Sequence, residues 1–582
     1  MLSNPVASAN PKVGLCAVLL AALFGLGCPE EPGAGGDAGS APDAATEQDA
    51  GSADGPASLR GEVVLQRDTF PPPPGDLAGP LLIAVMTEEQ LANGEMPEHL
   101  VTLDADLALG PAHYEIGDLA PGRYYVMAMF DDNESFSPAH PAIDEGDIVT
   151  DMPRPVAIAA GQARQMDLLL NLVQGPAGPY CGAEPLDSDE RHCVFDFLWS
   201  EADRYYPFFV YKSIDWDAVR ERYEPLVEAA ATDKEFHFLM MQLLAELRDG
   251  HSWIPKLLAY YTPHVVLDAR LALVAGKVYV ERVAAGSSSE TAGLRVGDRI
   301  VSIEGETFIE FSNRYGKYIP RPNDHFYNYV LLSIWLASEL DQAARVEVDR
   351  GGIPISLALP RISYASYQSP TVASSRLTGA SGNDYGYIWI ATFDPDLEDE
   401  ILSRFNTALA DLQDVSGLII DTRENGGGAL TLVNAVLSAL VAEPAVAERQ
   451  YLRGSSEYFE TQLTPADNGF HGPVVALVDE GSYSGGNLVP SVLQHLGRAT
   501  VLGRTGGGGF AGVESWLLTA QFVSRMGVWL IALDDGTIVE LGVEPDVAVE
   551  RTSADILAGK YAEPGNPERD IVLQRALELL GN

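Results

Sequence analysis

Two glycine-rich turns constrain this chain more than any other feature of its sequence. The first spans Asp421–Gly428 (D-T-R-E-N-G-G-G), and the second spans Gly481–Gly486 (G-S-Y-S-G-G). Each follows a short apolar run typical of a buried strand and precedes an apolar pattern typical of a helix. A strand that ends in glycines and opens a helix exposes backbone N–H groups above the turn. Two such turns side by side, one of them carrying a serine, can supply an oxyanion hole and a nucleophile, so the pattern indicates an enzyme.

The length and the charge of the chain limit its organisation and its partners. A chain of 582 residues is too long for one core, so about three or four domains are expected. The formal net charge is −46, from 83 acidic and 37 basic residues. Such a chain repels phosphates, which disfavours nucleic acid and anionic membrane surfaces as partners. Solubility in a salty or extracellular medium is the plainest explanation of the acidity.

The first 28 residues are typical of an export signal. Lys12 precedes the apolar stretch Val13–Gly27, which is too short to cross a bilayer comfortably, and Cys28 follows. Gly27-Cys28 resembles the end of a bacterial lipobox, although Gly25 stands where Leu is usual. We therefore expect an exported protein, in the bacterial periplasm or on the outer surface, anchored to the membrane only through lipid on Cys28. Residues 29–57 are small, polar and acidic, which predicts a disordered linker.

The remaining cysteines predict a disulfide rather than a metal site. Cys181 and Cys193 would close a short loop and can pair in an oxidising compartment. No second Cys or His pair has ligand spacing, so no metal is expected.

The part of the chain before the two turns predicts three further regions. Residues 58–173 contain strand-like runs separated by Pro, Gly and Asp, as in a transthyretin-like or immunoglobulin-like β-sandwich. Within it, Asp131–Glu134 form a solvated loop or, as the alternative, a calcium site. Residues 180–258 are predicted to be helical, because apolar residues from Phe236 to Leu247 repeat at helical spacing. Residues 262–362 include Gly286–Gly305, which resembles a PDZ domain, with a helical insertion over 307–343.

The region around the turns predicts an α/β domain over residues 376–565. Strands and helices alternate there, which is typical of a sheet with crossover helices. Strands are expected at 387–390, 417–421, 473–478 and 499–503, and helices at 397–412, 429–442 and 484–496.

Three motifs, in order behind the PDZ-like segment, resemble the C-terminal-processing and tricorn-core family of serine peptidases. They are Asp421-x-Arg423-x-Asn425-x-Gly427-Gly428, then Ser482-x-Ser484-Gly485, then Gly542-Val543-Glu544-Pro545-Asp546. The resemblance covers residues 180–565. It implies a helical cap (180–258), a PDZ domain (262–362) and a catalytic core of crotonase-like or Clp-protease-like α/β fold, with the β-sandwich in front.

The resemblance also implies the catalytic residues. One arrangement in the family pairs the serine with a lysine about 25 residues later, but Arg504 stands in that segment and no lysine occurs between residues 319 and 550. The other arrangement takes a histidine from the cap, and Leu247-x-Asp249-Gly250-His251 matches it. The expected nucleophile is then Ser484, the general base His251 and the acid that orients it Glu540. The amides of Gly427 and Gly485 are expected to form the oxyanion hole. No metal and no cofactor are expected.

Other interpretations of these residues stay open at this point. His251 can instead cap a helix end, and Ser484 can be the N-cap residue of an inactive homologue. Glu514 is a rival to Glu540, and His471 and His495 are rival bases. Asn487 replaces the acid that is usual three residues after the serine.

The predicted function is that of an exported serine endopeptidase working through an acyl-enzyme. The PDZ domain would help to bind peptide or protein substrates, with recognition of their C-termini as one option. The alternative is a catalytically inactive peptide-binding homologue, and a lesser one is a core that binds an apolar small molecule. The sequence does not define the physiological substrate or the oligomeric state.

Overall fold

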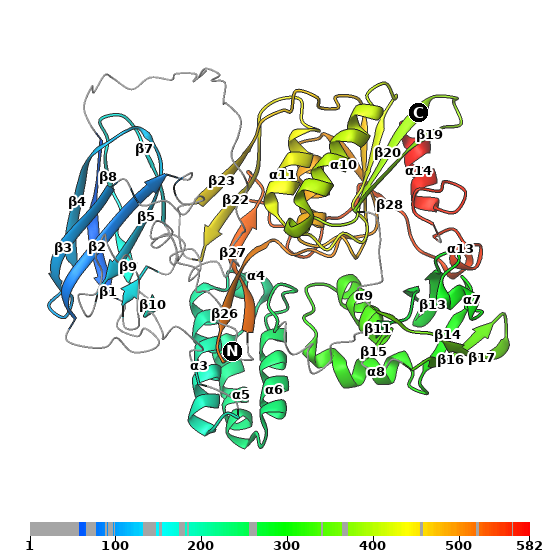
Figure 1. Ribbon diagram of the computed structural model, residues 1–582, viewed down its shortest axis with the longest axis horizontal. Helices are drawn as coiled ribbons and strands as arrows, with labels where there is room; N and C mark the ends of the chain where they lie inside the picture. Colours follow the sequence, from blue (N-terminus) through cyan, green and yellow to red (C-terminus); the bar gives the residue numbers. More distant parts are fainter. Residues whose placement is uncertain are drawn as a thin grey trace, which may run out of the picture. The chain divides into compact units, whose positions relative to one another are not determined.

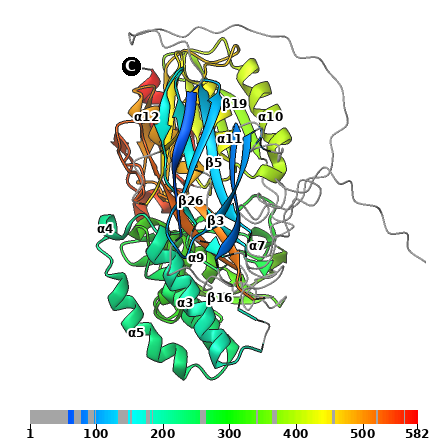
Figure 2. The same cartoon turned by 90° about the vertical axis from the view of Figure 1, so that its left-hand side faces the viewer.

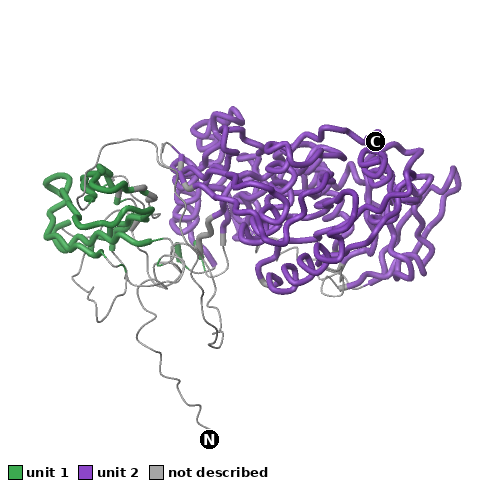
Figure 3. The backbone as a smooth tube through the Cα atoms, turned by 90° about the horizontal axis from the view of Figure 1, so that it is seen from above, with its two compact units in different colours: residues 1–184, 514–521 green, residues 185–513, 522–582 purple. Residues whose placement is uncertain are grey.

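The protein forms two compact units in the computed structural model, and Figure 3 colours them separately. One comprises residues 1–184 and 514–521, the other residues 185–513 and 522–582. The structure describes residues 57–65, 77–87, 90, 97, 99–131, 147–150, 154–170, 172–173, 181–182, 185–254, 265–338, 342–363, 371–453, 458–519, 523–561 and 563–581. The predicted export signal (1–28), its lipobox-like end and nearly all of the predicted linker (29–57) lie outside these residues, as do positions 132–134 of the predicted acidic loop.

The N-terminal unit contains two sheets that share one apolar core. The first has the order β4-β1-β8, with β9 also paired to β1, and the second has the order β10-β6-β5-β2-β3, with β7 paired to β5. Alternate residues along β2, such as Leu81, Ile83 and Val85, are fully buried, which is the pattern of a strand with one face on a core. The strands are β1 (Ala57–Leu65), β2 (Ala78–Thr87), β3 (His99–Asp106), β4 (Ala112–Leu119), β5 (Gly122–Phe130), β6 (Ile148–Val149), β7 (Arg154–Ile158), β8 (Ala163–Gln165), β9 (Leu168–Leu170) and β10 (Leu172–Val173).

The second unit begins with a helical cap. Its helices are α3 (Ser188–Tyr205), α4 (Phe209–Lys212), α5 (Trp216–Ala229) and α6 (Asp233–Ala245). Side chains of Asp187, Asp215 and Thr232 accept hydrogen bonds from the first turns of α3, α5 and α6, which fixes where these helices begin. Helix α3 packs on α5 and α5 on α6 (Figures 1 and 2). Among the helices that the structure describes, none combines the length and the apolar character that a membrane crossing requires.

The two cysteines that the sequence pairs are both disulfide-bonded. Cys181 is buried, and Cys193 lies in the first half of α3. This outcome agrees with the predicted disulfide.

The PDZ region is a five-stranded antiparallel sheet of order β12-β13-β14-β16-β17. The predicted helical insertion is part of its core, because Leu331, Leu332 and Trp335 of α9 pack among the sheet residues. Ala272 of the edge strand β12 is buried against the core domain instead. The elements are β11 (Val265–Val266), β12 (Arg270–Val274), β13 (Lys277–Arg282), α7 (Ser288–Thr291), β14 (Arg299–Ile303), α8 (Phe308–Tyr315), η2 (Gly316–Tyr318), α9 (Asp324–Trp335), β15 (Ala337–Ser338), β16 (Ala344–Arg350), β17 (Ile353–Leu359) and β18 (Ile362–Ser363).

The core domain is built on a six-stranded sheet of order β19-β20-β21-β24-β25-β28. Strand β19 runs antiparallel to β20, and every other neighbouring pair is parallel. A second sheet has the order β23-β22-β27-β26. The strands are β19 (Val372–Thr378), β20 (Asp384–Ile390), β21 (Leu418–Asp421), β22 (Ala445–Leu452), β23 (Tyr458–Leu463), β24 (Val474–Val478), β25 (Ala499–Gly503), β26 (Ala511–Leu517), β27 (Val523–Ala532) and β28 (Val547–Ala548).

Helices cover both faces of the six-stranded sheet. Ile420 and Ala476 point to one face and pack with α10–α12, whereas Ile419, Val475 and Leu477 point to the other and pack with α13 and α14. This alternation explains why the strands are apolar throughout. The fold class predicted from the sequence is confirmed: an α/β core with a helical cap and a PDZ sheet, preceded by a β-sandwich. The helical segments are η4 (Pro395–Leu397), α10 (Glu398–Asp411), α11 (Leu430–Ser438), α12 (Gly485–His495), α13 (Ser553–Leu557) and α14 (Ile571–Leu580).

Candidate active site

The two glycine-rich turns lie side by side because the strands before them are parallel neighbours. β21 and β24 pair in parallel, so their carboxyl ends meet at one edge of the sheet. Two hydrogen bonds then join the turns directly. The N–H of Tyr483 donates to the carbonyl of Asn425 at 2.9 Å, and Ser482 Oγ donates to the carbonyl of Thr422 at 2.7 Å. The sequence prediction that these turns are adjacent is confirmed.

The charged residues of the first turn are structural. Arg423 Nη2 lies 2.5 Å from Asp421 Oδ2 and 2.6 Å from Asp570 Oδ2, and all three residues are buried. Asp421 also accepts the hydroxyl hydrogen bond of Tyr387 at 2.7 Å. Asp570 is in turn the N-cap residue of α14. The D-x-R part of the motif therefore anchors the turn to the sheet and to α14.

Ser484 occupies a strained backbone conformation at the start of α12. Its φ is 53° and its ψ is −123°, a combination that non-glycine residues seldom adopt and that is typical of functional turns. Its N–H donates to the carbonyl of Gly508 at 2.8 Å, which holds the turn. The hydroxyl makes no N-cap hydrogen bond and has no partner in the described part of the chain. The side chain is thus available for chemistry rather than used as a helix cap.

The oxyanion amides are only partly those that the sequence predicts. Gly485 opens α12, and its N–H has no hydrogen-bond partner among the described residues, as expected at a helix N-terminus. The N–H of Gly427, by contrast, donates to Asn425 Oδ1 at 2.8 Å. In the same turn, the N–H groups of Gly426 and Gly428 are the ones left without a partner in the described chain. Gly427 instead provides space, because a Cβ there would lie 2.6 Å from Ser484 Cβ.

The cap brings His251 to the residue beside Ser484. His251 Nδ1 lies 3.4 Å from the hydroxyl of Tyr483, and the two ring centroids are 4.9 Å apart. No hydrogen bond joins His251 to Ser484, both of which are described. Burial lowers the pKa of His251 below its ordinary value, although the carboxylate of Asp249 opposes this. The ring is therefore held as neutral imidazole, the form that accepts a proton.

Asp249 is a second carboxylate of the site, and it was missed as a functional group by sequence reasoning. Its Oδ1 accepts the N–H of His251 at 3.0 Å and lies 3.8 Å from His251 Nδ1. Its Oδ2 accepts the hydroxyl of Ser252 at 2.7 Å. Gly527 on β27 leaves room for it, since a Cβ there would lie 2.6 Å from Asp249 Oδ2. The only sequence signal was its place in the L-x-D-G-H segment.

Glu540, the predicted orienter of His251, is bonded elsewhere. Its Oε1 lies 2.6 Å from Lys212 Nζ, and its Oε2 accepts the N–H of Phe510 at 2.7 Å. No hydrogen bond joins Glu540 to His251, although the structure describes both residues. Burial raises the pKa of Glu540 to about 7, against the effect of Lys212. Lys212, on α4 of the cap, had no signal in the sequence beyond its position after an aromatic run.

The glycine run 506–509 packs between the nucleophile turn and the Glu540 segment. A Cβ at Gly506 would lie 2.2 Å from Asn487 Oδ1, and one at Gly508 would lie 2.1 Å from the Glu540 carbonyl. Asn487 Oδ1 accepts the N–H of Val543 at 3.0 Å. The amide that replaces the usual acid thus fixes the closing G-V-E-P-D segment.

The remaining candidates lie away from Ser484. Arg504 pairs with Glu480, with Nη2 and Oε2 2.7 Å apart. His471 is exposed, and His495 sits on the last turn of α12, opposite the end that carries Ser484. His495 pairs with Asp534, and with Asp535 they form the one group with metal-ligand spacing in the described part of the chain. The side chain of Glu514 lies outside the described residues.

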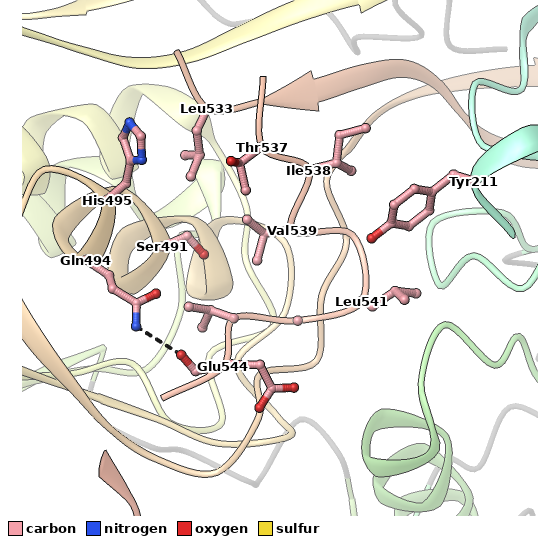
Figure 4. Close-up of a pocket in the computed structure, with 12 residues that line it drawn as sticks. Tyr211, Ser491, Gln494, His495, Leu533, Thr537, Ile538, Val539, Leu541 and Glu544 are labelled. Atoms are coloured by element: carbon pink, nitrogen blue, oxygen red, sulfur yellow. Dashed lines mark hydrogen bonds between the residues drawn. The ribbon is translucent and has the colours of Figure 1, made fainter. Parts of the chain in front are cut away.

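A cavity of about 310 Å³ is lined by residues of α12 and by residues of the segment 537–544 (Figure 4). Val539 and Leu541 line it, whereas Glu540 between them does not. Gln494 on α12 closes one side by donating to the carbonyl of Glu544 at 3.0 Å. The cavity is therefore separate from the group of Lys212, Glu540 and His251.

The PDZ sheet is tied to both turns by partly buried ion pairs. Arg282 donates to both carboxylate oxygens of Glu424 in the first turn, each at 2.6 Å. Arg270 Nη2 donates to Asp479 Oδ2 at 2.7 Å, immediately before the second turn. A smaller cavity of about 140 Å³ lies between β12 and α9. Its lining is apolar on one side, with Leu271, Leu273 and Leu332, and charged on the other, where Arg504 and Arg551 both pair with Glu480.

Comparison with known protein families identifies three domains. Residues 187–245 match the tricorn protease C1 domain, residues 279–314 match a PDZ domain, and residues 384–549 match peptidase family S41. These matches fall on the cap, the PDZ sheet and the core in the order that the sequence predicts.

The chain is also similar to individual proteins along about two thirds of its length. The chain is 24% identical over 405 residues to carboxy-terminal processing protease CtpB of Bacillus subtilis, covering 66% of this chain and 76% of CtpB. It is 25% identical over 398 residues to tricorn protease homolog 1 of Streptomyces coelicolor, covering 63% of this chain but only 33% of that relative. The crystal structure of mature CPAF superposes with a TM-score of 0.51 at 13% identity, covering 68% of this chain and 96% of that chain, which shows a shared fold.

Proposed function

Because its domains make this chain a serine-type peptidase of family S41, we propose that it hydrolyses peptide bonds through an acyl-enzyme on Ser484. The observation that carries the proposal is the strained turn at Ser484. Among the described residues, neither its hydroxyl nor the neighbouring N–H of Gly485 has a hydrogen-bond partner, and a neutral histidine reaches the adjacent residue. These are a nucleophile, an oxyanion donor and a base in one place.

The reaction divides into acylation and deacylation. His251 takes the hydroxyl proton of Ser484 as Oγ bonds to the substrate carbonyl carbon. The carbonyl oxygen becomes an oxyanion and accepts hydrogen bonds from the N–H of Gly485 and from an unpaired amide of the first turn, each contributing a few kcal/mol. The C–N bond then breaks, and His251 returns the proton to the leaving amine. Water, deprotonated by His251, releases the acyl group and restores the hydroxyl.

The Ser484–His251 hydrogen bond forms in this scheme when substrate enters. Catalytic hydrogen bonds are often long or unformed without substrate and tighten in the complex. Tyr483, which now contacts His251 Nδ1 at 3.4 Å, keeps the ring near the nucleophile meanwhile. The 3.8 Å separation between Asp249 Oδ1 and Nδ1 gives the imidazolium a carboxylate partner as it forms.

The substrate class is peptides or proteins, with the PDZ region contributing to their binding. β12 is an edge strand, as strand addition requires, and the cavity between β12 and α9 offers an apolar wall of Leu271, Leu273 and Leu332. This combination suits an extended peptide with an apolar side chain, and a free C-terminal carboxylate remains one option for its end. Binding of matched peptides with a free and an amidated C-terminus, followed by calorimetry, tests this point; equal affinity would argue against carboxylate recognition.

Export and anchoring are proposed from the sequence. The apolar run before Gly27-Cys28 and the acidic linker after it favour a lipid-anchored enzyme outside the cytoplasm. Mass spectrometry of the mature protein should find a lipid-modified N-terminus at Cys28. An unmodified N-terminus elsewhere would remove the anchor.

The proposed hydrolysis is tested by a serine-reactive probe and a peptide library. The wild type should react with a fluorophosphonate and cleave library peptides, and Ser484→Ala should do neither. Ser356→Ala, on the exposed face of β17, is the matched control and should behave as the wild type. No labelling and no cleavage by the wild type would favour the inactive peptide-binding alternative.

A further inference from the structure

Helix α9 of the PDZ region reaches the turn that carries the nucleophile. Phe326, in the first turn of α9, stacks on the ring of Tyr483, with the ring centroids 4.3 Å apart and the ring planes 23° apart. Tyr483 stands directly before Ser484 in the chain and also contacts the ring of His251, at 4.9 Å between centroids. One aromatic ring of the nucleophile turn is therefore in contact with the proposed base and with the PDZ region at once.

Three glycines make room for this pair of rings. A Cβ at Gly250 would lie 2.5 Å from the hydroxyl oxygen of Tyr483 and 3.0 Å from Phe326 Cε1. A Cβ at Gly509 would lie 2.5 Å from Tyr483 Cζ. A Cβ at Gly507 would lie 2.9 Å from Phe326 Cδ2. A side chain at any of these positions would displace one of the two rings, because packed interiors leave no spare volume. The cap turn and the glycine run are thus shaped around the contact between the two rings.

Asn323 determines where α9 begins and binds the helix to the core domain. Its Oδ1 accepts the N–H of Phe326 at 2.8 Å, which makes it the N-cap residue of α9. Its Nδ2 faces three backbone carbonyls, those of Gly506 and Gly507 at 3.1 Å each and that of Leu541 at 2.8 Å. An amide can do both, since it has an acceptor and two N–H donors. The same side chain therefore places Phe326 and holds α9 against the core.

The ring of His251 has few other contacts that could orient it. Its Nδ1 lies 3.4 Å from the hydroxyl of Tyr483, and in the described part of the chain no other group hydrogen-bonds to the ring. Asp249 Oδ1 lies 3.8 Å from Nδ1, which is beyond hydrogen-bond distance. A histidine base acts only when one ring nitrogen is turned towards the proton that it takes. The orientation of His251 therefore depends on where Tyr483 lies.

We propose that Phe326 and Asn323 are positioning residues for the reaction, which act through Tyr483 on the orientation of His251. The inference rests on the proposed function, in which His251 takes the hydroxyl proton of Ser484. Phe326 closes one face of the Tyr483 ring and so keeps its hydroxyl beside His251. Removal of the Phe326 ring opens space there and lets Tyr483 move. Small displacements of a catalytic group lower the rate of the chemical step and leave the ground-state binding of substrate unchanged.

Steady-state kinetics of Phe326 variants test this role. Phe326→Ala should lower kcat by about ten- to a hundredfold and leave KM within about twofold of the wild type. Phe326→Leu refills part of the space and should restore part of that loss. The matched control is Phe308→Ala, which removes a half-buried ring that contacts Trp335 at the other end of α9, 5.4 Å between centroids, and it should keep the wild-type kcat. An unchanged kcat in Phe326→Ala, or an equal loss in Phe308→Ala, would overturn the proposal.

The variant Asn323→Asp separates the contact with the core from the folding of α9. Aspartate is as good an N-cap residue as asparagine, so the helix should begin at the same residue. Its carboxylate has no N–H for the carbonyls of Gly506, Gly507 and Leu541, so kcat should fall about tenfold or more. The matched control is Asp215→Asn, which exchanges the same two side chains at the N-cap of α5 and should keep the wild-type kcat. A wild-type kcat in Asn323→Asp would contradict the proposal.

A further measurement does not depend on hydrolysis. In NMR spectra of histidine-labelled protein, the imidazole resonances of His251 are assigned by their absence in His251→Gln. They should shift in Phe326→Ala and in Asn323→Asp, because the neighbouring ring of Tyr483 changes position, and they should stay in place in Phe308→Ala. Unchanged His251 resonances in both α9 variants would overturn the inference. If the wild type neither cleaves peptides nor reacts with the probe, the proposed function fails, whereas these resonances still decide whether α9 positions His251.

Discussion

The two halves of the site are held together by different forces. The half on the core sheet consists of two turns fixed by backbone hydrogen bonds, such as those from Tyr483 to Asn425 and from Ser484 to Gly508. The half on the cap consists of side chains held by buried charges, with Lys212 and Asp249 at its centre. The core half is therefore sensitive to sterics, whereas the cap half is sensitive to charge and pH.

This difference separates binding of an oxyanion from generation of a nucleophile. Backbone amides have no ionisation to adjust, so the core half needs only the correct shape. A histidine base needs its proton affinity set by its surroundings, and the cap half supplies them. Variants in the two halves should consequently fail in different ways.

The largest effect is expected when the reacting group of either half is removed. Ser484→Ala and His251→Ala should each lower kcat/KM by about 10³-fold or more, because the nucleophile and its base act as a unit. For the same reason the double variant should be scarcely worse than either single one. Full activity in Ser484→Ala would end the proposed mechanism. Full activity in His251→Ala alone would leave the nucleophile and require another base, with His471 and His495 as the first candidates.

The steric sensitivity of the core half is tested by neighbouring glycines. In Gly427→Ala the new Cβ would lie 2.6 Å from Ser484 Cβ, at a φ of 97°, so about a hundredfold loss of kcat/KM is expected. Gly426→Ala is the matched control, because nothing lies within 4 Å of its Cβ and its N–H is retained. Steady-state kinetics of both variants decide the point. Equal effects of the two substitutions would show that space at Gly427 is not what the turn requires.

The buried ion pairs that hold the first turn should affect the stability of the protein rather than the pH dependence of its activity. Asp570→Ala leaves Arg423 buried with one carboxylate instead of two, which should cost about 3–5 kcal/mol in the free energy of unfolding. Asp414→Ala breaks an exposed pair with Arg376 and should cost no more than about 1 kcal/mol. Denaturant unfolding of both variants gives the comparison. Similar losses of unfolding free energy in the two variants would mean that burial does not make the first ion pair more important for stability than the second.

The sequence predicted the core half far better than the cap half, and the reason is physical. Strands and helices of the core follow from local apolar patterns, as shown by the predicted strand 499–503 and helix 484–496 against the observed β25 and α12. The adjacency of the turns follows from parallel pairing. The Lys212–Glu540 pair spans 328 positions and has no local signal. The hydrogen bond that occupies the N–H of Gly427 depends on a side-chain orientation that spacing does not specify.

The pH sensitivity of the cap half should also be visible at His251 itself. Burial lowers its pKa below the ordinary 6.5, so the loss of kcat/KM on protonation of the base should lie below pH 6.5. As the pH falls through 6.5, the unfolded chain binds this proton before the folded chain does, so the folded protein loses stability towards acid pH. His251→Gln should reduce that loss, measured as the change in Tm with pH. If Tm instead begins to fall above pH 6.5, and still does so in His251→Gln, the loss of stability belongs to another group.

The smallest effect is expected where the core half contains a charge that takes no part in catalysis. Arg504 stands in the segment where other members of the resembled family carry their lysine base, yet it pairs with Glu480 through Nε at 2.9 Å and Nη2 at 2.7 Å. A lysine at this position keeps that salt bridge with one contact fewer, so Arg504→Lys should cost about 1 kcal/mol of stability and leave kcat/KM within about twofold of the wild type. Its ammonium stays charged beside Glu480, and a charged amine is no base. Arg504→Lys should therefore not restore activity to His251→Ala. Recovery of hydrolysis in that double variant would show that a lysine of the core can act as the base, and that the cap is dispensable for proton transfer.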